Sequence, residues 1–312
     1  HYFLSSMANK KTVMKKPISN IKNPLPLSSR LIAWTNKGFV HCILLILGLV
    51  WLTPSLGLLI TSLRSRADIA QSGWWMSILE WNFNIQNYVE VLNNSELPPP
   101  GFKESFINSI VVTVPSTIIP IFFAALTAYV IVFTKLPIRN FLYLLIIALM
   151  IIPLQVTWYP VLSMYKTFDI TGTWFGLWIA HSAYGSCFAV FLLRNFFIEI
   201  PEEIIESAKL DCYNHFQIFT RIIVPLSLPA IASLAIFQFV WVWNDIMNAI
   251  VFLQDSDKYP LTVGVQRLLG HYQNKWHLLA AGSWLTMLVP LLIFFALQRY
   301  FVRGVTAGAV KG

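Results

Sequence analysis

The side chains best suited to ligand chemistry gather in one apolar run, at Trp241, Trp243, Asn244 and Asp245. An amide and a carboxylate can hydrogen-bond the hydroxyl groups of a ligand, and an indole ring can stack on an apolar face of the same ligand. The same side chains could instead bond to neighbouring helices or anchor in lipid, and the sequence leaves both interpretations open. Weaker candidates of the same kind are Gln238, Gln155 and Trp158. We call these seven residues the candidate path residues.

No other residues have a spacing that indicates catalysis or metal binding. The six histidines and three cysteines are scattered along the chain without a ligand pattern. The sequence has no G-x-S-x-G nucleophile motif and no G-x-x-x-x-G-K-[ST] phosphate loop. We therefore expect a chain that is not an enzyme, holds no metal and binds no cofactor of its own.

The composition points to a membrane protein. Hydrophobic residues make up 56% of the 312 residues and charged residues only 12%, whereas about 25% of a soluble domain is charged. The formal net charge is +8, but the Lys and Arg residues flank apolar runs and form no basic patch of the kind that binds nucleic acid. These features exclude most soluble enzymes. The expected surroundings are membrane lipid, with no nucleic acid.

Six apolar runs are long enough to cross a bilayer, whose core of about 30 Å needs about 20 helical residues. Alternating strand patterns are absent, so we expect helices, which satisfy their own backbone hydrogen bonds in lipid. The fold class is therefore an all-α integral membrane protein with six transmembrane helices. The expected spans are residues 39–62, 106–133, 141–164, 173–193, 224–253 and 278–301.

The basic residues predict the orientation. Seven Lys and Arg residues and no acid precede the first run, which places the N-terminus in the cytoplasm by the positive-inside rule. Six spans then return the C-terminus to the cytoplasm. The expected domains are a basic N-terminal segment over residues 1–38, a six-span transmembrane domain over 39–301 and a cytoplasmic tail over 302–312.

A long outer segment, residues 63–105, contains Trp74, Trp75 and Trp81. Tryptophan is enriched where a protein meets the membrane surface, so a short helix resting at that interface is one interpretation. Ordinary packing within the loop is the other. The sequence does not decide between them.

The cytoplasmic loop between the fourth and fifth expected spans, about residues 194–223, predicts two short amphipathic helices. Glu202 and Glu203 fit the first turn of the first helix, where acids complement the helix dipole. Asn214 and Gln217 have the spacing of a capping box at the start of the second. Such a knob suits docking into a groove of a soluble partner, but amphipathic helices also lie on lipid surfaces.

The spacing within this loop favours docking. The pattern E-A-A, three residues, G, nine residues, I-x-L-P is matched by Glu206-Ser207-Ala208, Cys212 and Ile222-Ile223-Val224-Pro225. The loop resembles the signature loop of bacterial ABC importer permeases, a coupling helix that sits in a cleft of the ATPase subunit. Ser207, Cys212 and Val224 depart from the pattern, and Cys212 replaces a glycine that would permit a positive φ. The residues that the resemblance assigns to ATPase coupling are Glu206, Ser207, Ala208, Asp211, Cys212, Ile222 and Pro225, with Glu206 as the electrostatic contact.

Other segments extend the resemblance over about residues 102–312. The C-terminal sequence from Gln298 to Gly312 and the pair Asn108-Ser109 are similar to carbohydrate-uptake permeases of the maltose type. The run from Phe237 to Asp245 most resembles the α-glucoside and glucosylglycerol group.

The resemblance implies partners that this chain lacks. These are two copies of an ABC ATPase that carries ATP and Mg²⁺, a second and different permease subunit, and an extracytoplasmic sugar-binding protein. The chain would form half of a translocation path for a sugar or glucoside in a bacterial inner membrane. Two alternatives remain, namely a self-sufficient secondary transporter or channel, and an ABC permease for a non-sugar solute such as glycerol phosphate or a polyamine.

Overall fold

The computed structural model describes the backbone of residues 27–93, 100–211, 213–271 and 275–307, and every regular element in these ranges is a helix. The predicted all-α class is therefore confirmed for the described part of the chain. Most of the N-terminal segment, the end of the tail and Cys212 lie outside the described residues. The chain divides into two compact units, His1–Pro54 and Ser55–Gly312.

Four helices are long and apolar enough to cross a membrane, and the count rises to six if each of two bent helix pairs forms one span. α1 (Leu27–Ser62) contains the first and reaches from one unit into the other. The second unit contains three more, in α5 (Phe102–Phe133), α8 (Trp174–Phe197) and α15 (Trp276–Ala307). All four coincide with predicted spans to within a few residues.

The third predicted span is not one straight helix. α6 (Arg139–Leu149) and α7 (Leu154–Thr167) meet at an angle of 103°. Pro153 precedes α7, and proline both lacks an N–H donor and disfavours helical geometry in the residue before it. The predicted span over 141–164 did not take the break at Pro153 into account.

The fifth predicted span is also interrupted. A bend of 75° precedes α12 (Leu228–Trp243), and the chain breaks again at residues 244–246 before α13 (Met247–Leu253). The first bend lies between Pro225 and Pro229. The second break has a different cause, a side-chain cap on α13, which is described below.

Short helices connect the long ones. α2 (Arg66–Gln71), α3 (Met76–Glu80) and α4 (Gln86–Asn93) follow α1. Between α8 and α12 lie α9 (Glu202–Leu210), α10 (His215–Ile218), the π-helical turn η1 (Phe219–Ile223) and α11 (Val224–Leu226). The 3₁₀ turn η2 (Ser256–Lys258) and α14 (Leu261–His271) precede α15.

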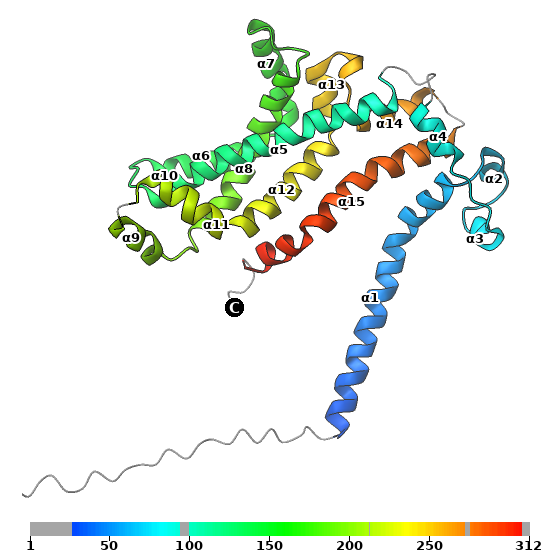
Figure 1. Ribbon diagram of the computed structural model, residues 1–312, viewed down its shortest axis with the longest axis horizontal. Helices are drawn as coiled ribbons and strands as arrows, with labels where there is room; N and C mark the ends of the chain where they lie inside the picture. The colour runs from blue at the N-terminus through cyan, green and yellow to red at the C-terminus, as the bar shows by residue number, and fades with distance from the viewer. Residues whose placement is uncertain (1–26, 94–99, 212, 272–274, 308–312) are drawn as a thin grey trace, which may run out of the picture. The chain divides into compact units, whose positions relative to one another are not determined.

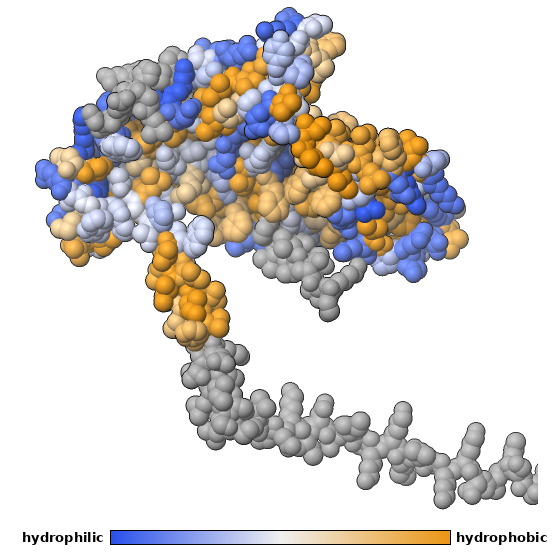
Figure 2. Space-filling model, turned by 180° about the vertical axis from the view of Figure 1, so that it is seen from behind, coloured by the Kyte–Doolittle hydropathy of each residue, from blue (hydrophilic) through white to orange (hydrophobic). Residues whose placement is uncertain are grey.

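The long helices of the second unit carry elements at both ends. α5 packs along α8, and α12 packs against both α5 and α15 (Figure 1). α9, α10 and α11 lie at one end of α5, whereas α4 and α14 lie at the other. Hydrophobic side chains cover much of the face seen in Figure 2, and hydrophilic ones gather toward its two ends. This distribution suits helices that cross a bilayer.

Candidate functional site

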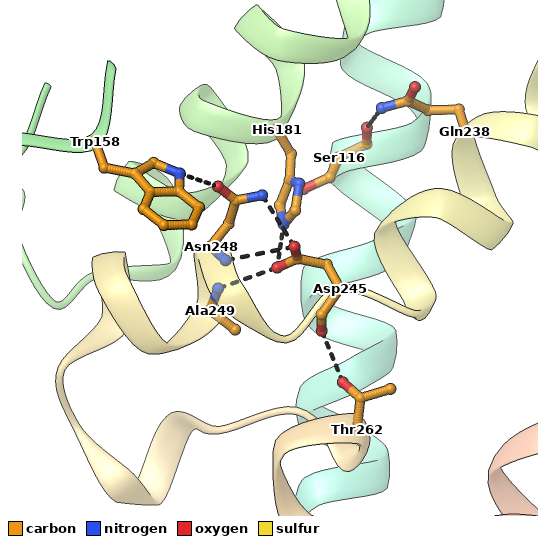
Figure 3. Close-up of polar contacts among 8 residues, drawn as sticks. All are labelled: Ser116, Trp158, His181, Gln238, Asp245, Asn248, Ala249 and Thr262. Carbon is orange, nitrogen blue, oxygen red and sulfur yellow. Dashed lines mark hydrogen bonds and ion pairs between the residues drawn. The ribbon is translucent and has the colours of Figure 1, made fainter. Parts of the chain in front are cut away.

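The break after α12 is organised around the carboxylate of Asp245 (Figure 3). Its Oδ1 atom accepts hydrogen bonds from Asn248 Nδ2 at 3.0 Å and from the Asn248 backbone N–H at 3.4 Å. Its Oδ2 atom accepts from the Ala249 backbone N–H at 3.1 Å. These donors belong to the first turn of α13, so Asp245 caps that helix. The cap explains why one apolar run forms two helices.

Three further helices contribute polar groups to this break. Trp158 of α7 donates from Nε1 to Asn248 Oδ1 at 2.9 Å, and the Thr262 hydroxyl of α14 donates to the Asp245 carbonyl at 2.8 Å. His181 of α8 is fully buried, with Nε2 3.7 Å from Asp245 Oδ2. Hydrogen bonds therefore tie α7 and α14 to the junction between α12 and α13, and His181 of α8 lies beside it.

Two hollows open beside this junction. Trp241, Asn244 and Asp245 line one of about 760 Å³, and the Asp245 side chain is 13% exposed. Asn244 also lines a second hollow of about 580 Å³ between α12, α14 and α15. Its polar lining is hydroxyl and amide groups, from Asn244, Thr262, Gln266, Ser283 and Thr286. Hollows of this size hold small ligands in other proteins.

The remaining candidate path residues do not line these two hollows, although Trp158 bonds Asn248 at the junction. Trp243 is buried in the core, stacked on Phe239 at a centroid distance of 5.6 Å, and donates to the Thr286 carbonyl at 3.1 Å. Gln238 is also buried and donates to the Ser116 carbonyl at 3.1 Å, while lining a separate hollow of about 270 Å³. Gln155 is exposed near the start of α7. Of the seven, the structure brings Trp241, Asn244 and Asp245 to one hollow.

Sequence reasoning missed His181, Asn248 and Thr262. Asn248 follows Asp245 by three residues, a spacing at which a carboxylate meets the backbone of the next helical turn. That signal was available in the sequence. His181 carried none, because only the packing of α8 against α12 and α13 brings it to Asp245 and places its ring edge-on to Trp241, with 5.4 Å between centroids.

The predicted two-helix knob is present at the other end of α5. α9 buries Ile205 and Ala208 in a core shared with Ile218 and Ile223. The Asn214–Gln217 capping box forms as predicted at the start of α10. Among the residues assigned to ATPase coupling, the exposed ones are Glu206, Ser207, Asp211 and Pro225, Ile222 is half-buried, Ala208 is buried and Cys212 lies outside the described residues.

One side chain of α5 links the knob to the long helices. The Tyr129 hydroxyl and His215 Nδ1 are 2.9 Å apart and share a hydrogen bond. The Tyr129 ring also packs edge-on against Phe219 of η1, with 5.4 Å between centroids. A displacement of α10 would therefore act directly on α5, which runs to the opposite end of the unit.

These features define a membrane protein with a polar junction among its helices and a separate two-helix knob. Residues 116–307 match the family described as "Binding-protein-dependent transport system inner membrane component", and the chain belongs to this family. The predicted resemblance is confirmed, and the chain is a transport subunit.

Two curated relatives and one solved structure are similar to this chain over most of its length. It is 44% identical over 279 residues to the osmoprotective compounds uptake permease protein GgtD of a Synechocystis species, covering 87% of this chain and 91% of that protein. It is 45% identical to the alpha-glucoside transport system permease protein AglG of Rhizobium meliloti, covering 74% of this chain and 61% of that protein.

The solved structure supports the fold alone. It is a chain of a bacterial ABC transporter involved in the import of the acidic polysaccharide alginate, with a TM-score of 0.69 and 22% sequence identity. The match covers 88% of this chain and 98% of that chain. The arrangement of helices is thus that of an ABC importer permease.

Proposed function

We propose that this chain is one of two different permease subunits of an ATP-driven importer of sugars or glucosides in a bacterial inner membrane. The relatives are named for uptake of osmoprotective compounds and of alpha-glucosides. The family description supports an extracytoplasmic binding protein as the partner that delivers the solute. A second permease would supply the other half of the path.

The hollows at the α12–α13 junction are the observation that carries the cargo proposal. Their polar lining is hydroxyl, amide and carboxyl groups beside the Trp241 indole, and their named lining includes no Lys or Arg. Such groups suit a neutral polyhydroxy compound, since hydroxyls both donate and accept hydrogen bonds and sugar faces stack on aromatic rings. An α-glucoside or glucosylglycerol is the proposed cargo. Asn244 and Trp241 are the proposed contacts.

The knob is the proposed connection to the energy source. Two copies of a separate ATPase would bind ATP and Mg²⁺, and one copy would hold this knob in a surface groove. Burial of Ile205 and Ala208 fixes α9 on the permease, while Glu206 remains exposed for an ionic contact. Closure of the ATPase dimer would then push α9 and α10, and the Tyr129–His215 hydrogen bond would pass the motion to α5.

Co-purification with a charge reversal tests this proposal. The Glu206→Lys chain should retain much less ATPase in mild detergent than the parent chain, while its amount in the membrane stays unchanged. Glu104→Lys is the matched control, because Glu104 is an exposed acid at the opposite end of α5. Equal ATPase retention by the parent and the Glu206→Lys chain would contradict the coupling role. Mass spectrometry of the same preparation identifies any bound solute, and a phosphorylated or polyamine solute would contradict the cargo.

A further inference from the structure

The segment that follows α1 is folded onto the end of that helix. Asn87 of α4 donates from Nδ2 to the Ser62 and Arg64 carbonyls, each at 2.8 Å. The buried Arg64 guanidinium donates to the Ser72 carbonyl at 2.9 Å and the Asp68 carbonyl at 2.7 Å. One of these bonds uses the Ser62 carbonyl, the last of α1, which has no partner within the helix, and the others join the residues that follow it. α2, α3 and α4 are therefore held at a fixed level relative to the last turn of α1.

That level coincides with the ends of two candidate spans. The span in α1 ends at Ser62, and the span in α15 begins at Trp276. Trp276 and His277 line a hollow of about 400 Å³ together with Arg66, Ile69 and Ala70 of α2. If both candidate spans cross the bilayer, they end here, and α2 and α3 would lie near the level of the lipid headgroups.

The side chains of this segment suit that position. Leu79 is 76% exposed, Trp81 81% and Ile85 70%. Trp75 and Ile78 are exposed as well. Contiguous exposed apolar residues are unfavourable in water, and tryptophan is favoured at the boundary between headgroups and acyl chains. The exposed Arg66 next to the same boundary suits lipid phosphates.

We propose that α3 and residues 81–85 form a membrane-interface anchor, inserted at the level of the lipid headgroups, with Leu79 and Trp81 facing the acyl chains. The occupant of this surface is the phospholipid bilayer. Its position at the ends of two spans favours lipid over a soluble protein, which would approach from the aqueous side. The anchor fixes how far α1 and α15 extend from the bilayer. It depends on these helices being spans and does not depend on the cargo or the ATPase.

A nitroxide at position 79 tests the anchor. The variant Leu79→Cys, in a background carrying Cys42→Ala, Cys187→Ala and Cys212→Ala, is labelled and reconstituted with its co-purifying subunits into vesicles of phosphatidylethanolamine and phosphatidylglycerol. Collision with dissolved oxygen should be frequent at this site and collision with a water-soluble nickel complex rare. Gln71→Cys in α2 is the matched control, because Gln71 is an exposed polar residue of the same segment. At position 71, collision with the nickel complex should be frequent and collision with oxygen rare.

Two outcomes would overturn the anchor. Frequent nickel collisions at position 79 would place it in water, and rare collisions with both reagents would mean that another protein surface covers it. A second measurement avoids the cysteine background. Lipids brominated on the acyl chain quench tryptophan on contact, so the parent chain should lose more fluorescence than Trp81→Phe. Equal losses would likewise contradict the proposal.

Discussion

The Asp245 carboxylate holds the start of α13 by three hydrogen bonds, two from Asn248 and one from Ala249. Its oxygens are thus largely occupied within the chain. This leaves Asn244 and Trp241, its neighbours in the hollow, as the better placed contacts for a solute. In the proposed path, Asp245 would therefore act by positioning the residues that line the hollow.

We expect Asp245→Ala to destabilise the junction by about 0.5–2 kcal/mol, the usual cost of losing a helix cap. Asp245→Asn should cost less, because one side-chain oxygen remains to accept from the first turn of α13. The thermal midpoint of the purified subunit complex, followed by size-exclusion chromatography after heating, measures both effects. Midpoints equal to that of the parent for both variants would show that the cap contributes nothing to stability.

How much of this junction the sequence predicts depends on how far apart along the chain the contacting residues lie. Asp245 was recognisable because an acid inside an apolar run is costly unless it has partners. Its partner Asn248 lies one helical turn away and was also within reach. His181 comes from another helix and gives no local signal, so only the assembled packing of α8 and α12 reveals its place beside Asp245.

Among the helices, local rules account for some features and tertiary packing for others. The Asn214–Gln217 capping box and the two helices of the knob follow from residue spacing. The bend before α7 could have been predicted from Pro153, because proline disfavours a continuous helix. The π-helical turn η1 has no such signal, since it depends on how Phe219 and Ile223 fit the core beneath the knob.

Removal of the Tyr129 hydroxyl should weaken coupling without dismantling the knob. Tyr129→Phe keeps the ring against Phe219 and loses the hydrogen bond to His215. A net hydrogen bond of about 1 kcal/mol corresponds to about a fivefold change in an equilibrium between two arrangements. We therefore expect several-fold more ATP hydrolysed per solute imported, measured in vesicles containing the complete importer.

The matched control for this variant is Tyr184→Phe. It removes a hydroxyl that bonds Thr157 of α7 at 2.8 Å, away from the knob. Its ratio of ATP hydrolysed to solute imported should stay at the parent value. If Tyr129→Phe also keeps the parent ratio, motion reaches α5 by another contact.

At the scale of the whole molecule, the knob and the polar junction lie at different places along the same long helices. α5 contacts the knob through Tyr129 and packs along α12, which ends at the junction. Close-packed protein interiors transmit displacement, because a helix cannot shift without moving the helices packed against it. An energy-consuming partner at the knob could thus alter hollows that it never touches.

This arrangement requires the knob to be cytoplasmic and η2 to be extracytoplasmic, which cysteine labelling can test. Ser207→Cys and Asp257→Cys each place a thiol at an exposed position, in α9 and η2 respectively. Both are made in a background lacking the three natural cysteines.

In intact cells whose outer barrier has been permeabilised, a membrane-impermeant maleimide should modify Asp257→Cys and spare Ser207→Cys. In inverted membrane vesicles washed with urea to remove peripheral subunits, the pattern should reverse. Modification of Ser207→Cys in the cells would place the knob outside, beyond the reach of any cytoplasmic ATPase, and the proposed energy coupling would then be wrong.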